Sequence, residues 1–161
     1  MANGQKDLVL EELENGVMRL ILNDEKRRNA LSENMLDALH EKIMNSAEDP
    51  KIRVVIISAK GPVFCAGHDL KEITQARVHK DDGIIYFQNL FDKCSEVMKG
   101  IVTNPKPVIA EVNGIATAAG CQLVASCDLA IASDASKFAT PGVNIGLFCS
   151  TPMVALSRNV S

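Results

Sequence analysis

The feature of this sequence that most constrains its fold is a repeated alternation between strand-type and helix-type apolar patterns. Residues 54–57 (VVII) form a continuous β-branched run, which is typical of a strand that is covered on both faces. Apolar residues recur three or four positions apart over 31–47 and over 84–101, which predicts one amphipathic helix before that strand and a long one after it. Two more strand patterns follow at 107–112 and 129–132. Because no linker or repeat interrupts this order, the sequence predicts one α/β unit.

Turn and cap residues indicate where the first elements begin and end. Asn15-Gly16 is a strong hairpin signal between two apolar runs, so the chain is expected to open with a β-hairpin. Ser32 stands where the N-cap of the first helix is needed, because its hydroxyl can accept a bond from a free N–H of the first turn. Asp49-Pro50 should end that helix, since proline disfavours helical conformation in the residue before it.

Small residues cluster in the later connections. Residues 60–67 are predicted to form a loop, and residues 68–69 the polar start of the next helix. The stretch 116–120 is expected to open another short helix. Near the end, Thr151-Pro152 has the pattern of an N-cap followed by a first helical residue, and an apolar stripe continues from there to the end of the sequence.

The charge balance argues against a strongly negative partner. The chain has 17 Lys and Arg against 20 Asp and Glu, a net charge of −3, so no large basic surface is expected for nucleic acid or for an anionic membrane. No apolar run reaches the roughly 18 residues that a membrane-spanning helix needs. The five cysteines form no CxxC pair and are expected to be reduced. We therefore expect a protein that handles a small molecule in the cytoplasm, or in the mitochondrial matrix if a transit peptide has been removed.

Two turns rich in small residues are the candidate places for chemistry. They span residues 64–70 (FCAGHDL) and 113–122 (NGIATAAGCQ), and each leads from a strand pattern into a helix pattern. Helix starts expose unpaired backbone N–H groups, so two of them facing each other would hold one developing oxyanion. The alternative is that the small residues only let the helices pack closely on the sheet.

The same segments resemble a known family. VVIISAKGPVFCAGHDLKE (54–72), VNGIATAAGCQLVASCDLAIASD (112–134), FATPGVNIGL (138–147) and KRRNAL (26–31) are similar, in this order, to the signature of the crotonase (enoyl-CoA hydratase/isomerase) superfamily. The resemblance implies a spiral of ββα units that binds acyl-CoA thioesters, with no metal and no cofactor other than the coenzyme A of the ligand. It also implies that residues 1–161 are one acyl-CoA-binding domain, cut short before a C-terminal helical tail. With that tail, the family forms homotrimers or hexamers.

Site residues follow from matching the family's motifs to this chain. The two backbone N–H groups that hold the thioester carbonyl fall on His68 and Ala119. Backbone donors do not depend on side-chain identity, so the imidazole of His68 is not expected to act in catalysis. The implied substrate-binding residues are Lys26, Arg27, Arg28, Ala30, Ala66, Gly67, His68, Asp69 and Leu70. The basic side chains among them suit the phosphates of coenzyme A.

The chain departs from the family at the residues that perform hydration. The two glutamates of the family's hydratases fall on Gln122 and Gly142, neither of which can ionise. General acid–base catalysis contributes about 10²–10⁴ in rate, so little or no hydratase activity is expected. Two alternatives remain: an acyl-CoA lyase or isomerase that uses another base, and a non-catalytic acyl-CoA-binding, structural or regulatory subunit. Nucleotide binding is disfavoured because neither GxGxxG nor GxxxxGK[ST] is present.

Overall fold

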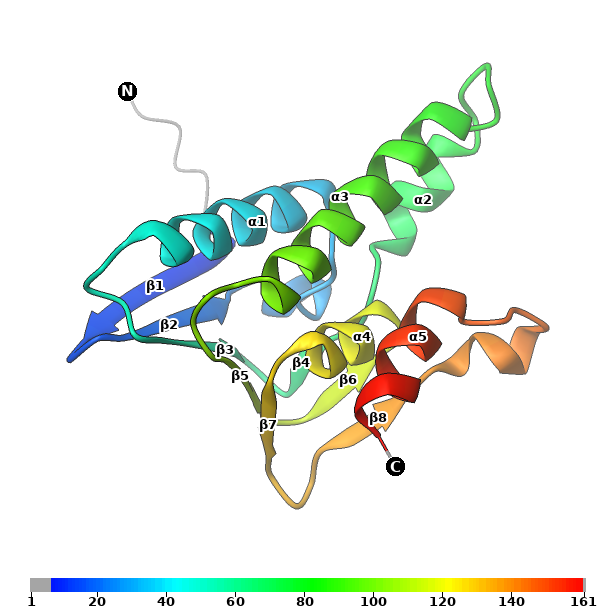
Figure 1. Cartoon of the computed structure of the whole chain (residues 1–161). Coiled ribbons are helices and arrows are strands. Elements are labelled where there is room, and N and C mark those ends of the chain that lie inside the picture. Colours follow the sequence, from blue (N-terminus) through cyan, green and yellow to red (C-terminus); the bar gives the residue numbers. More distant parts are fainter. Residues whose placement is uncertain (1–6, 161) are drawn as a thin grey trace.

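The computed structural model describes residues 7–160 and contains two sheets (Figure 1). The larger sheet has the strand order β1-β2-β3-β5-β7, with β1 antiparallel to β2 and every other pair parallel. Its strands are β1 (Val9–Glu14), β2 (Val17–Leu22), β3 (Val54–Ala59), β5 (Val108–Val112) and β7 (Leu129–Ala132). The hairpin predicted at Asn15-Gly16 is confirmed, because both residues adopt the positive φ angles that a tight hairpin turn requires.

The smaller sheet consists of three short parallel strands in the order β4-β6-β8. They are β4 (Val63–Cys65), β6 (Ile115–Thr117) and β8 (Lys137–Ala139). Each of them directly follows a strand of the larger sheet, and each pair of strands leads into a helical segment. This repeated strand–strand–helix step is the ββα spiral that the resemblance implied.

Helices cover one face of the larger sheet, where the core lies. The helices are α1 (Glu33–Glu48), α2 (Leu70–Ala76), α3 (Ile84–Val102), α4 (Ala119–Ser126) and α5 (Ser150–Asn159), with short 3₁₀ turns η1 (Glu25–Arg27) and η2 (Pro141–Ile145). In Figure 1, α1 and α3 lie side by side over the sheet, and α2 with the start of α3 projects away from it. Alternate residues of the central strands, such as Leu20 and Ile57, are fully buried and belong to the same core cluster as fully buried Leu39 and Ile43 of α1. Each such side chain contributes roughly 1.5–3 kcal/mol of burial free energy.

The long elements agree with the sequence predictions. Ser32 caps α1, its Oγ accepting a hydrogen bond from the N–H of Met35 at 3.2 Å. The helix ends at Glu48, before the predicted Asp49-Pro50 stop. No helix within residues 7–160 combines the length and the apolar character that crossing a membrane requires.

Four local predictions are wrong. Val54 and Ile56 are only half-buried, so β3 is covered fully on one face and not on both. The segments 60–67 and 116–120 hold the short strands β4 and β6, which become strands only by pairing with each other. The helix α5 begins at Ser150 with Cys149 at the N-cap position, so Thr151-Pro152 lies inside its first turn.

Candidate functional site

Two backbone turns from distant parts of the sequence meet beside the smaller sheet. One is Gly67-His68, after β4, and the other is Ala118-Ala119, at the start of α4. Gly67 has a φ angle of +87°, and a β-carbon there would lie 3.0 Å from the β-carbon of Ala118 and 3.3 Å from the backbone nitrogen of Ala119. Glycine is therefore required at residue 67 both by its conformation and by this close contact.

The two turns present N–H groups that the fold does not use. Within residues 7–160, the backbone N–H groups of His68 and Ala119 have no hydrogen-bond acceptor. Ala118 lies between β6 and α4 with φ 52° and ψ −122°, a conformation that costs a non-glycine residue on the order of 1–3 kcal/mol. Its own N–H donates to the carbonyl of Ala139 in β8 at 2.9 Å, which anchors the turn. The structure thus brings the two predicted oxyanion donors to adjacent turns with both donors free.

The two segments predicted to bind coenzyme A lie side by side. The N–H of Ala66 donates to the carbonyl of Arg28 at 3.1 Å, and the N–H of Leu31 donates to the carbonyl of Gly67 at 2.8 Å. Ala30 is buried between these contacts. The loop before α1 and the loop before α2 therefore form one continuous backbone surface next to the free N–H of His68.

Asn29 holds this loop in place, a role that the sequence analysis did not identify. Its side chain is fully buried; Oδ1 accepts from the N–H of Asp24 at 2.8 Å, and Nδ2 donates to the carbonyls of Lys60 and Val63 at 2.9 and 2.7 Å. The residue has φ 50°, which asparagine tolerates better than most residues. Its placement inside the matched KRRNAL segment was the available signal.

The basic trio Lys26, Arg27 and Arg28 has two kinds of surroundings. Nη2 of Arg27 lies 2.6 Å from a carboxylate oxygen of buried Asp69, and its Nη1 lies 3.6 Å from one of Glu72. The same Asp69 carboxylate caps α2 by accepting two backbone N–H bonds at 2.8 and 3.3 Å. Lys26 and Arg28 are exposed and form no ion pair with any described residue. The side chains of Arg27 and Asp69 therefore hold the two loops together, and only Lys26 and Arg28 of the trio have free charges.

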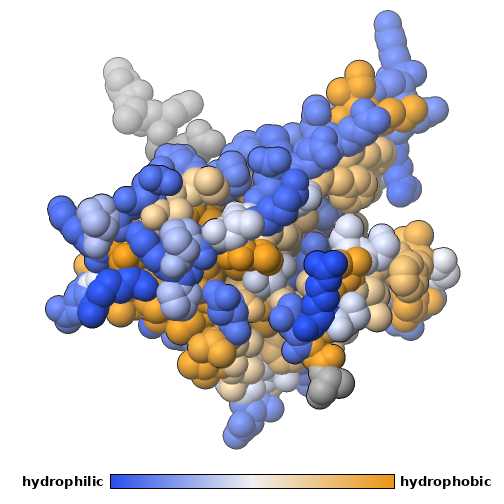
Figure 2. Space-filling view, viewed as in Figure 1, coloured by the Kyte–Doolittle hydropathy of each residue, from blue (hydrophilic) through white to orange (hydrophobic). Residues whose placement is uncertain are grey.

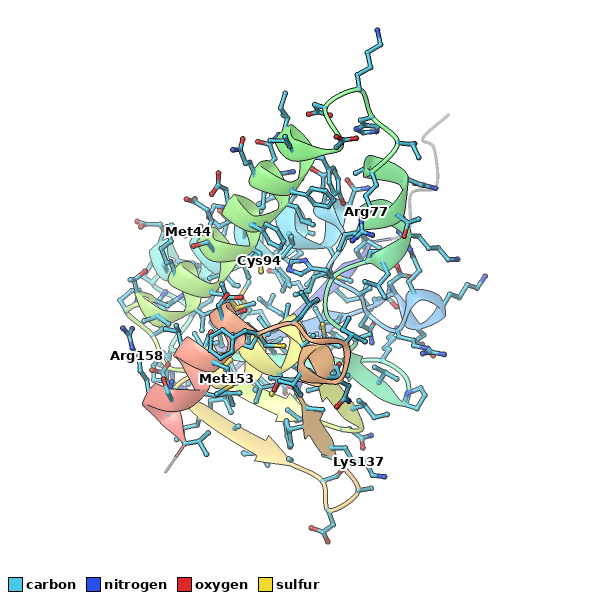
Figure 3. The ribbon with its side chains drawn as sticks, turned by 90° about the vertical axis from the view of Figure 1, so that its right-hand side faces the viewer. Met44, Arg77, Cys94, Lys137, Met153 and Arg158 are labelled. Atoms are coloured by element: carbon cyan, nitrogen blue, oxygen red, sulfur yellow. The ribbon has the colours of Figure 1, made fainter. Side chains whose placement is uncertain are left out.

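A cavity of about 450 Å³ lies between α3, α4 and α5, and His68 and Gln122 both line it. Figure 3 labels two of its lining residues, Cys94 on α3 and Arg158 near the end of α5. Two buried polar atoms of its lining, Nδ1 of His68 and Oε1 of Gln122, have no hydrogen-bond partner. Leaving such atoms unpaired costs about 1–3 kcal/mol each, so this end of the cavity holds two unsatisfied polar atoms. The other lining residues are Phe91, Cys94, Ser95, Met98, Lys99, Val102, Thr103, Ala125, Ser126, Thr151, Val154, Ala155, Arg158 and Asn159.

Of the predicted site residues, only His68 and Gln122 line this cavity, and Ala119, Gly142 and Leu70 are among those that do not. Gly142 is in η2, where a β-carbon would come 2.5 Å from Sγ of Cys149. The segment around it exposes apolar side chains, which form a pale orange surface at the right of Figure 2. Leu70, the first residue of α2, is 73% exposed. The structure thus brings Gln122 to His68 but does not bring Gly142 to either.

Burial sets the protonation of the groups at the site. It lowers the pKa of His68, an effect that the nearby carbonyl of Leu31 partly offsets, so the imidazole is neutral at pH 7. It raises the pKa of the Cys65 thiol to about 12 and that of Cys94 to about 11. Both thiols are therefore protonated near neutral pH, which argues against a nucleophilic cysteine.

Comparisons with known proteins agree with this architecture. The sequence model described as enoyl-CoA hydratase/isomerase matches residues 12–160. The mitochondrial enoyl-CoA hydratase domain-containing protein 3 of Danio rerio is 54% identical over 160 residues, which are 99% of this chain and 54% of the relative. Its Homo sapiens counterpart is 56% identical over 145 residues, which are 90% of this chain and 46% of the relative. The chain thus spans about half the length of the curated relatives that it matches.

Solved structures show the same likeness. The crystal structure of human enoyl Coenzyme A hydratase domain-containing protein 3 superposes with a TM-score of 0.85 at 52% identity, covering 94% of this chain and 58% of that one. An enoyl-CoA hydratase from Mycobacterium smegmatis superposes with a TM-score of 0.87 at 54% identity, covering 96% of this chain and 58% of that one. The family resemblance drawn from the motifs is confirmed.

Proposed function

Because the chain belongs to the enoyl-CoA hydratase/isomerase family, we propose that it binds an acyl-CoA thioester and holds the thioester carbonyl between the N–H groups of His68 and Ala119. The observation that carries this proposal is the contact between the two turns at Gly67, with both N–H groups free. Two donors aimed at one oxygen stabilise the negative charge that develops on it, and each donor of this kind typically contributes ~2.7–4 kcal/mol to a transition state.

The remaining parts of the ligand have matching surfaces. Exposed Lys26 and Arg28, beside the backbone of residues 66–70, supply charges for the phosphates of coenzyme A. The acyl chain enters the cavity between α3 and α5, where Met98 and Val154 form part of an apolar wall. The relatives' names place them in mitochondria, and we propose the same compartment, and assembly into trimers or hexamers, for a protein that carries the family's tail.

Hydration of an enoyl thioester is expected to be slow. No Asp or Glu is among the described residues that line the cavity, and Gln122 occupies the place of one family glutamate. The loss of two acid–base groups predicts a rate at least about a thousandfold below that of a two-glutamate hydratase. A non-catalytic acyl-CoA-binding or regulatory subunit is the second candidate, and the carboxylate-free lining favours it.

One preparation tests both the binding and the chemistry. Titration calorimetry with crotonyl-CoA measures affinity, and the shift of its carbonyl stretch on binding measures polarisation by the two N–H groups. Ala119→Pro removes one donor at a first helical position, where proline is tolerated, and should reduce the shift; Ala119→Gly keeps the donor and should not. A full shift in a folded Ala119→Pro variant contradicts the oxyanion assignment. Turnover within tenfold of an ordinary hydratase contradicts the expected loss of hydration.

A further inference from the structure

The cavity between α3, α4 and α5, which is proposed to take the acyl chain, contains one group that can accept a proton near neutral pH. We call this cavity the acyl cavity. Among its described lining residues, four side chains can exchange protons: His68, Cys94, Lys99 and Arg158. Burial raises the pKa of Cys94 to about 11, so its thiol keeps its proton at pH 7. Lys99 and Arg158 are exposed and carry positive charges in the last turns of α3 and α5. Among these four side chains, His68 is therefore the one that can act as a base near pH 7.

The position of the His68 ring suits this role. Nδ1 is buried, so Nε2 is the ring nitrogen that can meet a ligand in the cavity. The ring packs edge-on against Phe91, with 5.6 Å between ring centroids and an interplanar angle of 83°. The backbone N–H of the same residue is a proposed donor to the thioester oxygen. The imidazole is therefore tethered by its own side-chain bonds to the place where the thioester carbonyl and its neighbouring C2 atom are held.

Contrary to the expectation drawn from the motifs, we propose that the imidazole of His68 is catalytic and reversibly removes a proton from C2 of the bound acyl-CoA. This inference rests on the proposed function, because it needs the thioester carbonyl at the two N–H groups. In the step, the C2–H bond breaks and its electron pair forms the C1–C2 double bond of an enolate. The carbonyl electron pair moves onto the oxygen, which the N–H groups of His68 and Ala119 stabilise. The proton moves to Nε2 of His68 and exchanges with water before it returns to C2, so no oxidant, reductant or second substrate is required.

The surroundings keep His68 in the form that accepts a proton. Burial lowers its pKa below 6.5, with partial opposition from the Leu31 carbonyl. Lys99 of α3 and Arg158 of α5 line the same cavity, and both are exposed to solvent. The adjacent carboxylate of Asp69 is neutralised by its ion pair with Arg27. The rate of proton removal should therefore rise with pH through a pKa below the ordinary value of histidine and then level off.

A saturated ligand isolates this step, because butyryl-CoA has no double bond to hydrate. Incorporation of deuterium at C2 in D₂O, followed by mass spectrometry, measures proton removal. The wild-type protein should exceed the buffer rate, and His68→Gln should lower the enzyme-dependent rate at least about a hundredfold. The variant keeps its backbone N–H, so butyryl-CoA affinity and the carbonyl shift should stay unchanged. His40→Gln, at a half-buried residue of α1 that faces Glu96 of α3 outside the cavity, is the matched control and should exchange at the wild-type rate.

The outcomes separate the two proposals. Normal binding and carbonyl shift without exchange above the buffer rate overturn the role of His68 and leave the proposed function standing. Exchange that survives in His68→Gln, or that increases in proportion to hydroxide above pH 8, also overturns it. Absence of both binding and carbonyl shift in the wild-type protein overturns the proposed function itself, and with it this inference.

Discussion

Replacing Asn29 tests how firmly the predicted CoA-binding loop is held. Asn29→Ala removes three hydrogen bonds of 2.7–2.9 Å from a fully buried site, each contributing about 1 kcal/mol net. It also places an alanine at φ 50°, which costs about 1 kcal/mol more because asparagine tolerates this region better. The free energy of unfolding should fall by about 4 kcal/mol, a large part of the 5–15 kcal/mol of a typical domain. Coenzyme A affinity should fall with it, since the loop carries Arg28.

Urea unfolding and calorimetric titration with coenzyme A measure the two effects. Asn29→Gly loses the same hydrogen bonds, but glycine adopts a positive φ angle without strain. This variant should therefore be about 1 kcal/mol more stable than Asn29→Ala. Asn104→Ala is the control, because Asn104 is half-buried and donates two weaker bonds of 3.1–3.2 Å between α1 and the end of α3. It should cost about 1–2 kcal/mol and leave coenzyme A affinity unchanged. A loss below about 1 kcal/mol in Asn29→Ala would refute the reasoning.

Two further substitutions separate binding from structure. Arg28→Gln should weaken coenzyme A binding by about 1–3 kcal/mol without changing the urea midpoint, whereas Arg27→Gln should cost about 1–2 kcal/mol of stability because Asp69 loses its partner. Equal effects of both variants on affinity and stability would contradict this division. Gly120→Ala puts a β-carbon 2.3 Å from the carbonyl oxygen of Cys65, so the start of α4 must move. We expect a loss of about 1–3 kcal/mol and a smaller carbonyl shift of bound crotonyl-CoA; an unchanged shift would show that the turn tolerates the displacement.

Patterns that repeat over many residues carried the prediction of the fold. The helices α1 and α3 run for 16 and 19 residues, long enough for a helical period to show, and β7 occupies the predicted residues 129–132. The strands β4, β6 and β8 have three residues each, too few for an alternation. They form a sheet only because residues about 50 and 20 positions apart pair, as Val63 does with Ile115 and Ile115 with Lys137. No local pattern contains that information.

Some features of the candidate site could also be predicted from local sequence, and others could not. Small residues at Gly67 and Gly120 indicated the two turns, because close backbone approaches exclude side chains. The pairing of Arg27 with Asp69 joins residues 42 positions apart, and from sequence alone Arg27 had the same pattern as its basic neighbours. The cavity could not be predicted from the sequence either. Most of its lining comes from three helices between Phe91 and Asn159, and their relative placement depends on the spiral.

Several energetic costs of this fold lie where a ligand is proposed to bind. Ala118 adopts a conformation suited to glycine, the N–H groups of His68 and Ala119 have no acceptor, and Gln122 buries an unpaired amide oxygen. Neighbouring polar groups such as those of Asn29 are fully paired, so the fold is able to satisfy buried polar groups in this region. The backbone donors also do not depend on the side chains around them. On the proposed function, a chain with Gln122 and Gly142 at the motif positions of the family glutamates would retain the backbone geometry that polarises a thioester. Its chemistry would then depend on which base, if any, lies beside that geometry.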